Sequence, residues 1–215
     1  MVVNFNEQKS LLNNFLAEVR DEEIQKDRMR FRQNLKRIAE IMAYEISKSL
    51  KYQTETVRTP LGEAEVNMLQ SSIVLATILR AGLPMHDGLL SYFDKADSAF
   101  VSAYRKHTTG DQFDIHVQYA AAPTIEDKTL IISDPMLATG KSMVCVYKEL
   151  LKNGIPKETH IVSAVATQQA IDYLQKKIPS KLKIWVGAID EELTVKSYIV
   201  PGLGDAGDLA FGDKL

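Results

Sequence analysis

From residue 71 onward the sequence alternates short β-rich runs with helical stretches, and this alternation limits the possible folds more than any other feature. Several of the runs lack a polar residue at every second position, as expected for strands buried on both faces. Parallel strands need crossover connections, and the helical stretches between the runs are long enough to supply them. The pattern therefore predicts an α/β fold with a doubly wound, mainly parallel sheet. We expect strands at 72–79, 99–104, 129–133, 160–166 and 184–189, and crossover helices at 84–93, 140–153 and 168–178.

Two further segments are predicted outside these strands and helices. Residues 21–51 contain no Gly or Pro, and apolar residues recur there every three or four positions, which predicts one long helix. Its polar face mixes acidic and basic residues, so we interpret it as a solvated or subunit-facing surface rather than a nucleic-acid stripe. Residues 113–121 alternate polar and apolar side chains and predict an antiparallel arm. We expect one domain, 1–215, made of a helical N-terminal extension (1–70), the α/β core (71–190) and a C-terminal hood loop (191–215).

The composition argues against several classes of protein. The chain has 215 residues, 45% of them hydrophobic, which is enough for one sizeable core. The formal net charge of -2 provides no basic field for a long nucleic acid. The longest apolar run, 73–79, is too short to span a bilayer, and the first residues have no leader pattern, so we expect a cytoplasmic protein without membrane contact. Cys145 is the only cysteine and lies among apolar residues, which predicts a buried thiol and no intrachain disulfide.

The most informative stretch is TLIISDPMLATGKS, residues 129–142, in which a buried strand ends in an acid and a short loop opens a helix. Helix N-termini offer unpaired amides and a positive dipole to phosphate groups, and ligands of such sheets bind at the carboxyl ends of strands. The hydroxyls of Thr139 and Ser142 can donate to phosphate oxygens, and Gly140 allows close backbone approach. Asp134 only accepts hydrogen bonds when ionised, so it suits the vicinal hydroxyls of a ribose.

A P-loop is the competing interpretation of this stretch. Gly140, Lys141 and Ser142 match the end of the P-loop pattern, but its first glycine would fall on Pro135. Proline has no amide to donate and cannot adopt the positive φ of that turn. A nucleoside kinase and a purely structural turn therefore remain as minor alternatives.

Three segments resemble one known family. DPMLATG (134–140) resembles the motif that binds phosphoribosyl pyrophosphate (PRPP) in uracil phosphoribosyltransferases. ILRAGL (78–83), followed by Asp87 and Gly88, is similar to their pyrophosphate loop, and YIVPGLGDAG (198–207) to their uracil-binding segment. Weaker likeness extends toward the N-terminus at Phe31, Arg32, Tyr44, Glu45 and residues 59–62. The resemblance implies a type I phosphoribosyltransferase fold and the conversion of uracil and PRPP to UMP and pyrophosphate.

The same resemblance implies which residues bind PRPP. Arg80 would bind pyrophosphate oxygens bidentately, Gly82 would permit the tight turn, and a non-proline cis peptide would join Arg80 to Ala81. Arg105 resembles a second pyrophosphate-binding arginine, although Lys106, His107, Thr108 and Thr109 after it depart from the family. The implied PRPP site consists of Arg80, Ala81, Gly82, Arg105, Asp134, Pro135, Met136, Leu137, Ala138, Thr139, Gly140, Lys141, Ser142 and Asp205.

Lys141 also departs from the family, which usually has a second glycine there. We predict that it occupies the first turn of the helix and needs no positive φ.

The glycine-rich segment near the C-terminus is expected to be a loop that encloses uracil. Fixed backbone groups there would match the C4 carbonyl and N3 hydrogen of uracil and reject cytosine, which has the opposite pattern. The implied uracil-binding residues are Ile199, Val200, Gly204, Asp205 and Ala206, with Asp205 between the base and PRPP. The implied catalytic residues are Arg80, Arg105, Asp134 and Asp205.

The expected cofactor is Mg²⁺, held mainly through PRPP, because no acidic ligand cluster stands out and no protein metal site is predicted. No histidine shows a partner pattern for acid or base work, and we assign His86 a structural role. The family is usually dimeric or tetrameric; whether GTP acts as an effector is left open. The alternatives are a purine or orotate phosphoribosyltransferase, an RNA-binding attenuator on the same fold and a catalytically silent paralogue.

Overall fold

The computed structural model describes residues 1–107, 113–178 and 181–214, with the backbone alone at 104–107 and 113–115. Its central sheet has the strand order β1-β10-β9-β7-β4-β5-β6, with β8 paired to β9. All described pairs of this sheet are parallel except β5 with β6. The predicted doubly wound, mainly parallel sheet is therefore confirmed. The strands are β1 (Val2–Asn4), β4 (Ile73–Leu79), β5 (Asp97–His107), β6 (Phe113–Ala121), β7 (Thr129–Ser133), β8 (Met136–Leu137), β9 (Glu158–Thr167) and β10 (Leu182–Asp190).

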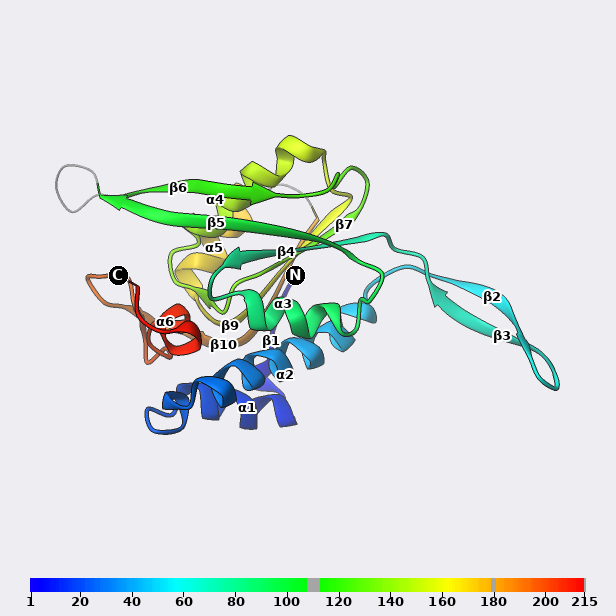
Figure 1. Cartoon of the computed structure of the whole chain (residues 1–215), viewed down its shortest axis with the longest axis horizontal. Coiled ribbons are helices and arrows are strands. Elements are labelled where there is room, and N and C mark those ends of the chain that lie inside the picture. Colours follow the sequence, from blue (N-terminus) through cyan, green and yellow to red (C-terminus); the bar gives the residue numbers. More distant parts are fainter. Residues whose placement is uncertain (108–112, 179–180, 215) are drawn as a thin grey trace.

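Helices cover both faces of the sheet and bury two apolar cores against it (Figure 1). The helices α1, α2 and α3 contribute to one core, and α4 and α5 to the other. No described helix is long and apolar enough to cross a membrane. The helices are α1 (Leu11–Arg20), α2 (Arg28–Ser47), α3 (Leu83–Leu90), α4 (Lys141–Leu150) and α5 (Gln168–Lys177), with short 3-10 turns at Phe5–Glu7, Ile24–Lys26 and Leu151–Asn153.

The N-terminal region is less helical than the sequence predicted. The long helix begins at Arg28 rather than near residue 21, because the side chain of Asp27 accepts a hydrogen bond from the Arg30 amide and caps it. The first strand joins the edge of the core sheet beside β10. The predicted helical extension therefore contains strands as well as helices.

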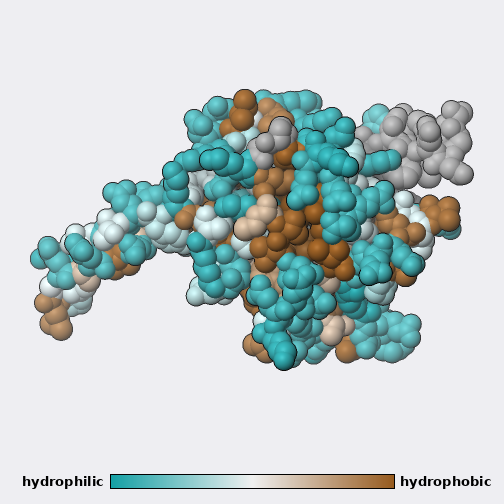
Figure 2. Space-filling model, turned by 180° about the vertical axis from the view of Figure 1, so that it is seen from behind, coloured by the Kyte–Doolittle hydropathy of each residue, from teal (hydrophilic) through white to brown (hydrophobic). Residues whose placement is uncertain are grey.

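Residues 52–69 form a hairpin instead of a helix, so that part of the predicted helical extension is wrong. Strands β2 (Tyr52–Thr59) and β3 (Gly62–Leu69) pair antiparallel, and every residue in them is exposed. Strand β2 contains three threonines and one valine, and such branched side chains favour extended backbone. The hairpin projects from the body (Figures 1 and 2), and Leu61 at its tip is 100% exposed.

Cys145 is partly exposed, so the prediction of a buried thiol is wrong. The buried side of α4 includes Met143, Val146 and Leu150, which recur at the three- and four-residue spacing of a helix face. Cys145 lies on the flank of that face. Burial of the thiol is still sufficient to raise its pKa.

Candidate active site

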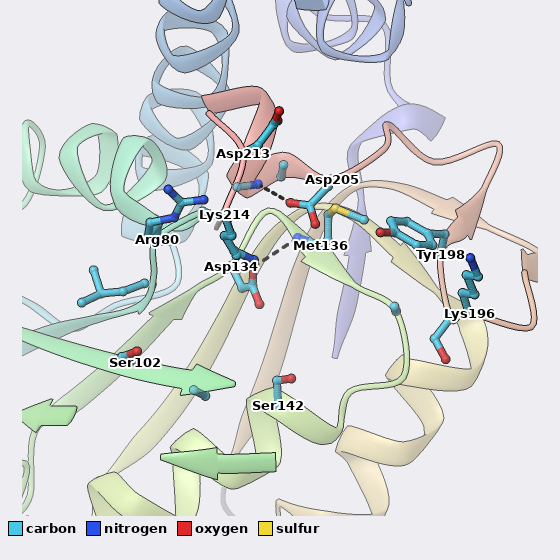
Figure 3. A pocket seen from close by; sticks show the side chains of 17 residues that line it. Arg80, Ser102, Asp134, Met136, Ser142, Lys196, Tyr198, Asp205, Asp213 and Lys214 are labelled. Atoms are coloured by element: carbon cyan, nitrogen blue, oxygen red, sulfur yellow. Dashed lines mark hydrogen bonds between the residues drawn. The ribbon is translucent and has the colours of Figure 1, made fainter. Parts of the chain in front are cut away.

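A cavity of about 850 Å³ opens at the carboxyl ends of β4 and β7. This is the edge at which open α/β sheets bind ligands. Figure 3 shows that strand tips, the start of α4 and the C-terminal segment all contribute side chains to it. The lining residues are Leu79, Arg80, Ala81, Ser102, Ala103, Asp134, Met136, Ala138, Ser142, Lys196, Ser197, Tyr198, Asp205, Ala206, Gly207, Asp213 and Lys214.

Asp134 lies directly after β7, at the tip of a strand whose five residues are all buried. Its amide donates to the Val162 carbonyl (3.1 Å), which fixes its backbone, and its carboxylate accepts from the Met136 amide (3.5 Å). Burial raises the pKa of Asp134 to about 7, and the negative charge of Asp205 adds to the effect. A carboxyl group with this pKa is about half protonated at neutral pH.

The loop after Asp134 presents alternate residues to the cavity. The Pro135 carbonyl accepts from the Val165 amide (3.0 Å), and β8 then pairs with β9. Successive side chains of an extended segment point to opposite sides. Met136 and Ala138 therefore line the cavity with Asp134, whereas Pro135 and Leu137 are buried and do not line it.

The predicted phosphate cradle forms at the start of α4, although few of its side chains line the cavity. Gly140 has a φ of +72°, and a Cβ there would lie 3.1 Å from the Ala170 carbonyl oxygen, so glycine fits this position. Lys141 is the first residue of the helix, which confirms its predicted place in the first turn. Ser142 lines the cavity, whereas Thr139, Gly140 and Lys141 are not among its lining residues.

The pyrophosphate loop contains the expected non-proline cis peptide, but one residue earlier than predicted. The cis bond joins Leu79 to Arg80, and the prediction of a cis bond between Arg80 and Ala81 is wrong. The turn closes directly behind the strand, because the Gly82 amide donates to the Ile78 carbonyl (2.9 Å). A Cβ at Gly82 would collide with the Thr77 hydroxyl, so this glycine shapes the turn without lining the cavity.

Arg80 faces the cavity but is anchored on one side by the C-terminal segment. Its Nη2 donates to Asp208 Oδ1 (3.2 Å) and to the Gly212 carbonyl (3.0 Å). Its Nε is buried and has no partner among the described residues. An N–H group in this situation is a ready donor for an anionic ligand.

The C-terminal hood is more ordered than the predicted loop. Strands β11 (Glu192–Leu193) and β12 (Ile199–Val200) pair antiparallel, and helix α6 (Ala206–Phe211) follows. The helix forms despite its glycine because the Asp205 carboxylate accepts from the amides of Gly207 (2.9 Å) and Asp208 (3.1 Å). The prediction of a loop is therefore wrong for α6.

The predicted uracil-binding residues divide into two groups. Asp205 and Ala206 line the cavity, whereas Ile199, Val200 and Gly204 do not. Ile199 is buried, and Val200 precedes a cis proline and is 39% exposed. Sequence reasoning missed the loop between β11 and β12, which brings Lys196, Ser197 and Tyr198 to the cavity. The only signal in the sequence was the tyrosine that opens the resembling segment 198–207.

Strand β5 also reaches the cavity, through Ser102 and Ala103, which the sequence did not single out. Arg105 and Lys106 follow in the same strand, paired with β6, but their side chains lie outside the described residues. The segment 108–112 also lies outside them. The predicted role of Arg105 therefore stays a prediction.

The histidine near the site has structural partners. His86 is buried, its Nε2 lies 3.1 Å from the Ser98 hydroxyl, and its ring contacts Phe100. Burial lowers the pKa of His86. These contacts support the structural role predicted for it.

Comparison with known sequences identifies the family. The sequence pattern described as Uracil phosphoribosyltransferase matches residues 6–213. A uracil phosphoribosyltransferase of Porphyromonas gingivalis is 58% identical over 214 residues, covering 100% of this chain and 99% of that protein. Another, from Pyrococcus furiosus, is 38% identical and covers 93% of this chain and 85% of that protein.

Solved structures agree with the sequence matches. A protein of Aquifex aeolicus superposes with a TM-score of 0.87 at 31% identity, covering 99% of this chain and 98% of that one. A hypoxanthine phosphoribosyltransferase of Staphylococcus aureus gives a TM-score of 0.50 at 14% identity, covering 75% and 76% of the two chains, and shares the fold alone. The predicted type I phosphoribosyltransferase fold is thereby confirmed. With its motifs gathered around one cavity and its whole length matched, the chain belongs to the uracil phosphoribosyltransferase family.

Proposed function

We propose that this protein transfers ribose 5-phosphate from PRPP to uracil, which forms UMP and releases pyrophosphate. One observation carries the proposal. Arg80, Asp134 and Asp205, each from a different segment that resembles the family, line the same cavity of about 850 Å³. The enzyme therefore works in pyrimidine salvage, as the family does.

The chemistry requires no nucleophile from the protein. Pyrophosphate leaves C1 of the ribose, positive charge grows on the sugar, and N1 of uracil attacks from the opposite face. The proton on N1 passes to the released pyrophosphate or to water as the new C1–N1 bond forms. The protein aligns the two reactants and neutralises charge on the leaving group. Arg80 is placed for the second task, because its Nη2 is fixed by Asp208 and Gly212 while its buried Nε lacks a partner among the described residues.

Asp134 is assigned to the ribose. Its carboxylate is at the end of β7, and the pKa raised to about 7 reflects burial without a cationic partner. Hydroxyl groups that donate to the carboxylate would favour its ionised form and hold the sugar in register. Asp205 faces the same cavity and, as the cap of α6, is fixed by two backbone amides. It would hold the sugar from the side of the base.

The uracil-binding role of the hood rests on its backbone. Ala206 lines the cavity and leaves room for the flat ring. Ile199 and Val200 lie outside the lining, and their backbone N–H and C=O groups are proposed to reach the C4 carbonyl and N3 hydrogen of uracil from behind it. Tyr198 adds an aromatic face at the cavity. Cytosine would leave buried backbone groups unpaired, so it should be rejected.

The cavity also fits the expected Mg²⁺. Asp134 and Asp205 place carboxylate oxygens on its wall, and such oxygens are the ligands that Mg²⁺ prefers. No group of three or more potential ligands occurs in the described ranges, so PRPP oxygens would supply much of the coordination. When bound, the ion would neutralise charge on pyrophosphate.

Further proposals rest on the family resemblance alone: a cytoplasmic location, a homodimer or homotetramer, and GTP as an effector. Light scattering of the purified protein measures the oligomer, and assays with and without GTP measure activation. Unchanged initial rates across a GTP titration would show that GTP is not an effector of this protein.

The deciding experiment supplies purified protein with PRPP, Mg²⁺ and one of uracil, cytosine, hypoxanthine or orotate. Nucleotide and pyrophosphate should form with uracil alone. Arg80→Ala and Asp134→Ala should abolish turnover while far-UV circular dichroism stays unchanged. Product from hypoxanthine or orotate, or full activity in either variant, would contradict the proposed function or the assigned role.

A further inference from the structure

We infer that Lys214 is an additional substrate-binding residue, whose ammonium group contacts the pyrophosphate of PRPP. The inference deepens the proposed function and rests on it for the identity of the ligand. It arises from the segment after α6, which the sequence analysis left without a role. Lys214 and Asp213 both line the cavity.

The position of this segment is fixed by bonds from three directions. Arg32 of α2 donates to the Ala210 carbonyl (2.6 Å), and Arg80 donates to the Gly212 carbonyl (3.0 Å). The Gly212 amide donates to the Asp208 carbonyl (2.8 Å). The chain beyond Gly212 therefore leaves the helix at the arginine assigned to pyrophosphate. Figure 3 shows Lys214 among the side chains of the cavity wall. A Cβ built at Gly207 would lie 4.0 Å from the Lys214 Nζ and 4.0 Å from the Ala81 Cβ, so the ammonium group lies close to the residue that follows Arg80.

The charges on the cavity wall explain why a cation is needed there. Its described acidic residues are Asp134, Asp205 and Asp213, and its described cationic residues are Arg80, Lys196 and Lys214. Pyrophosphate carries several negative charges, and Arg80 already shares its Nη2 with Asp208. A second cation beside Arg80 would offset both the ligand charge and the nearby carboxylates.

Lys214 is the lysine in the right place for this task. Lys196 lies beside Tyr198, on the other side of the cavity from Arg80 (Figure 3). Lys214 makes no ion pair within the described part of the chain, so no salt bridge has to be broken before it binds a ligand. Its ammonium is a compact charge on a flexible stem and complements the fixed fork of Arg80.

The test measures binding directly, so that it does not depend on turnover. Inorganic pyrophosphate with Mg²⁺, and separately ribose 5-phosphate, are titrated calorimetrically into the full-length protein and its variants. Lys214→Met should weaken pyrophosphate binding about tenfold, as expected for the loss of one charge-assisted contact. Ribose 5-phosphate binding should change less than twofold. Lys214→Arg should restore most of the affinity for pyrophosphate.

Lys181→Met is the matched control. Lys181 is an exposed lysine just before β10, at the end of the sheet opposite the cavity, and its replacement should change neither affinity. Unchanged pyrophosphate affinity in Lys214→Met would overturn the inference, as would an equal loss for both ligands or in both lysine variants. If the wild type binds pyrophosphate but makes no UMP, the proposed function fails while the Lys214 contact is still decided by the titration.

Discussion

The two halves of the cavity are built in different ways. The strand-tip half consists of the loops after β4 and β7, which extend from buried strands and are held by backbone bonds to the neighbouring strand β9 or within their own turns. The hood half has two strands of two residues each and a helix of six residues. It is held by side chains from distant elements, including Arg32, Arg80 and Asp190. The strand-tip half therefore depends on the core, whereas the part of the hood around β11 and β12 makes no bond to Arg80 among the hydrogen bonds of the described residues and can be altered separately.

The largest effect is expected in the strand-tip half, from Asp134→Asn. The change keeps the shape of the side chain but removes the carboxylate assigned to the ribose hydroxyls. Two lost charge-assisted hydrogen bonds would cost roughly 3–6 kcal/mol, so kcat/KM for PRPP should fall at least about 100-fold. Steady-state kinetics with varied PRPP at saturating uracil measures it. A loss below fivefold would mean that the carboxylate does not bind the sugar.

A pair of glycine substitutions tests whether the two halves are separable. Gly202 has a φ of +57°, and a Cβ there would collide with the Ile199 carbonyl oxygen of the hood. Gly140 has a φ of +72° and belongs to the strand-tip half. Either alanine adds backbone strain of about 1–2 kcal/mol. Gly202→Ala should raise KM for uracil about tenfold and leave KM for PRPP within twofold.

Gly140→Ala should show the reverse pattern, with KM for PRPP raised several-fold. Both variants need a check of folding, because the added strain also lowers the free energy of unfolding. If both variants raise both KM values equally, the halves are not independent and the comparison fails.

The contrast between local and long-range contacts explains which parts of the site could be predicted from the sequence. The strand-tip half is continuous along the chain, from the strand that ends before Asp134 through the turn to the start of α4. Local sequence patterns therefore located β7, Gly140 and the place of Lys141 in the first helical turn. The hood depends on contacts over long sequence separations, such as Arg32 with Ala210, which no local pattern reports. Helix α6 was missed because the side chain of Asp205 outweighs the low helix propensity of its glycine. The hairpin at 52–69 was missed because all of its residues are exposed, so the sequence shows no alternation between a buried and a solvated face there.

The ion pair between Arg80 of the strand-tip half and Asp208 of the hood half should have a smaller effect on KM for PRPP. Asp208→Asn weakens the anchor of Arg80 but leaves the bond to the Gly212 carbonyl. Both side chains of this pair are about one third exposed or more, at 38% and 34%, so the pair is worth about 1 kcal/mol or less. KM for PRPP should rise about three- to fivefold with little change in kcat, and Asp208→Glu should recover part of the loss. Asp94→Asn, at an exposed acid after α3, is the control and should leave both constants unchanged.

The last prediction concerns the free energy of unfolding rather than catalysis, and it isolates the contribution of Asp134 from those of the other titrating groups. Burial raises its pKa from 3.8 to about 7, so the folded chain holds this proton more tightly than the unfolded chain. The resulting stabilisation declines as pH rises from about 4 to about 7 and is then constant. The amide introduced by Asp134→Asn cannot ionise, so the stability of the wild type relative to this variant should fall over that range by roughly 4 kcal/mol, at about 1.4 kcal/mol per pKa unit.

Urea unfolding of both proteins between pH 4 and pH 8 measures this difference. The wild type is compared with the variant because other groups also change the free energy of unfolding with pH. The pKa of buried His160 is lowered to about 4, so its contribution to stability rises with pH, and this contribution is the same in both proteins. A histidine of lowered pKa destabilises the fold as pH falls from its unfolded value toward 4. Parallel curves for the two proteins would show that burial at the strand tip does not raise the pKa of Asp134 in the folded chain, and the stabilising proton assigned to this side chain would then be absent.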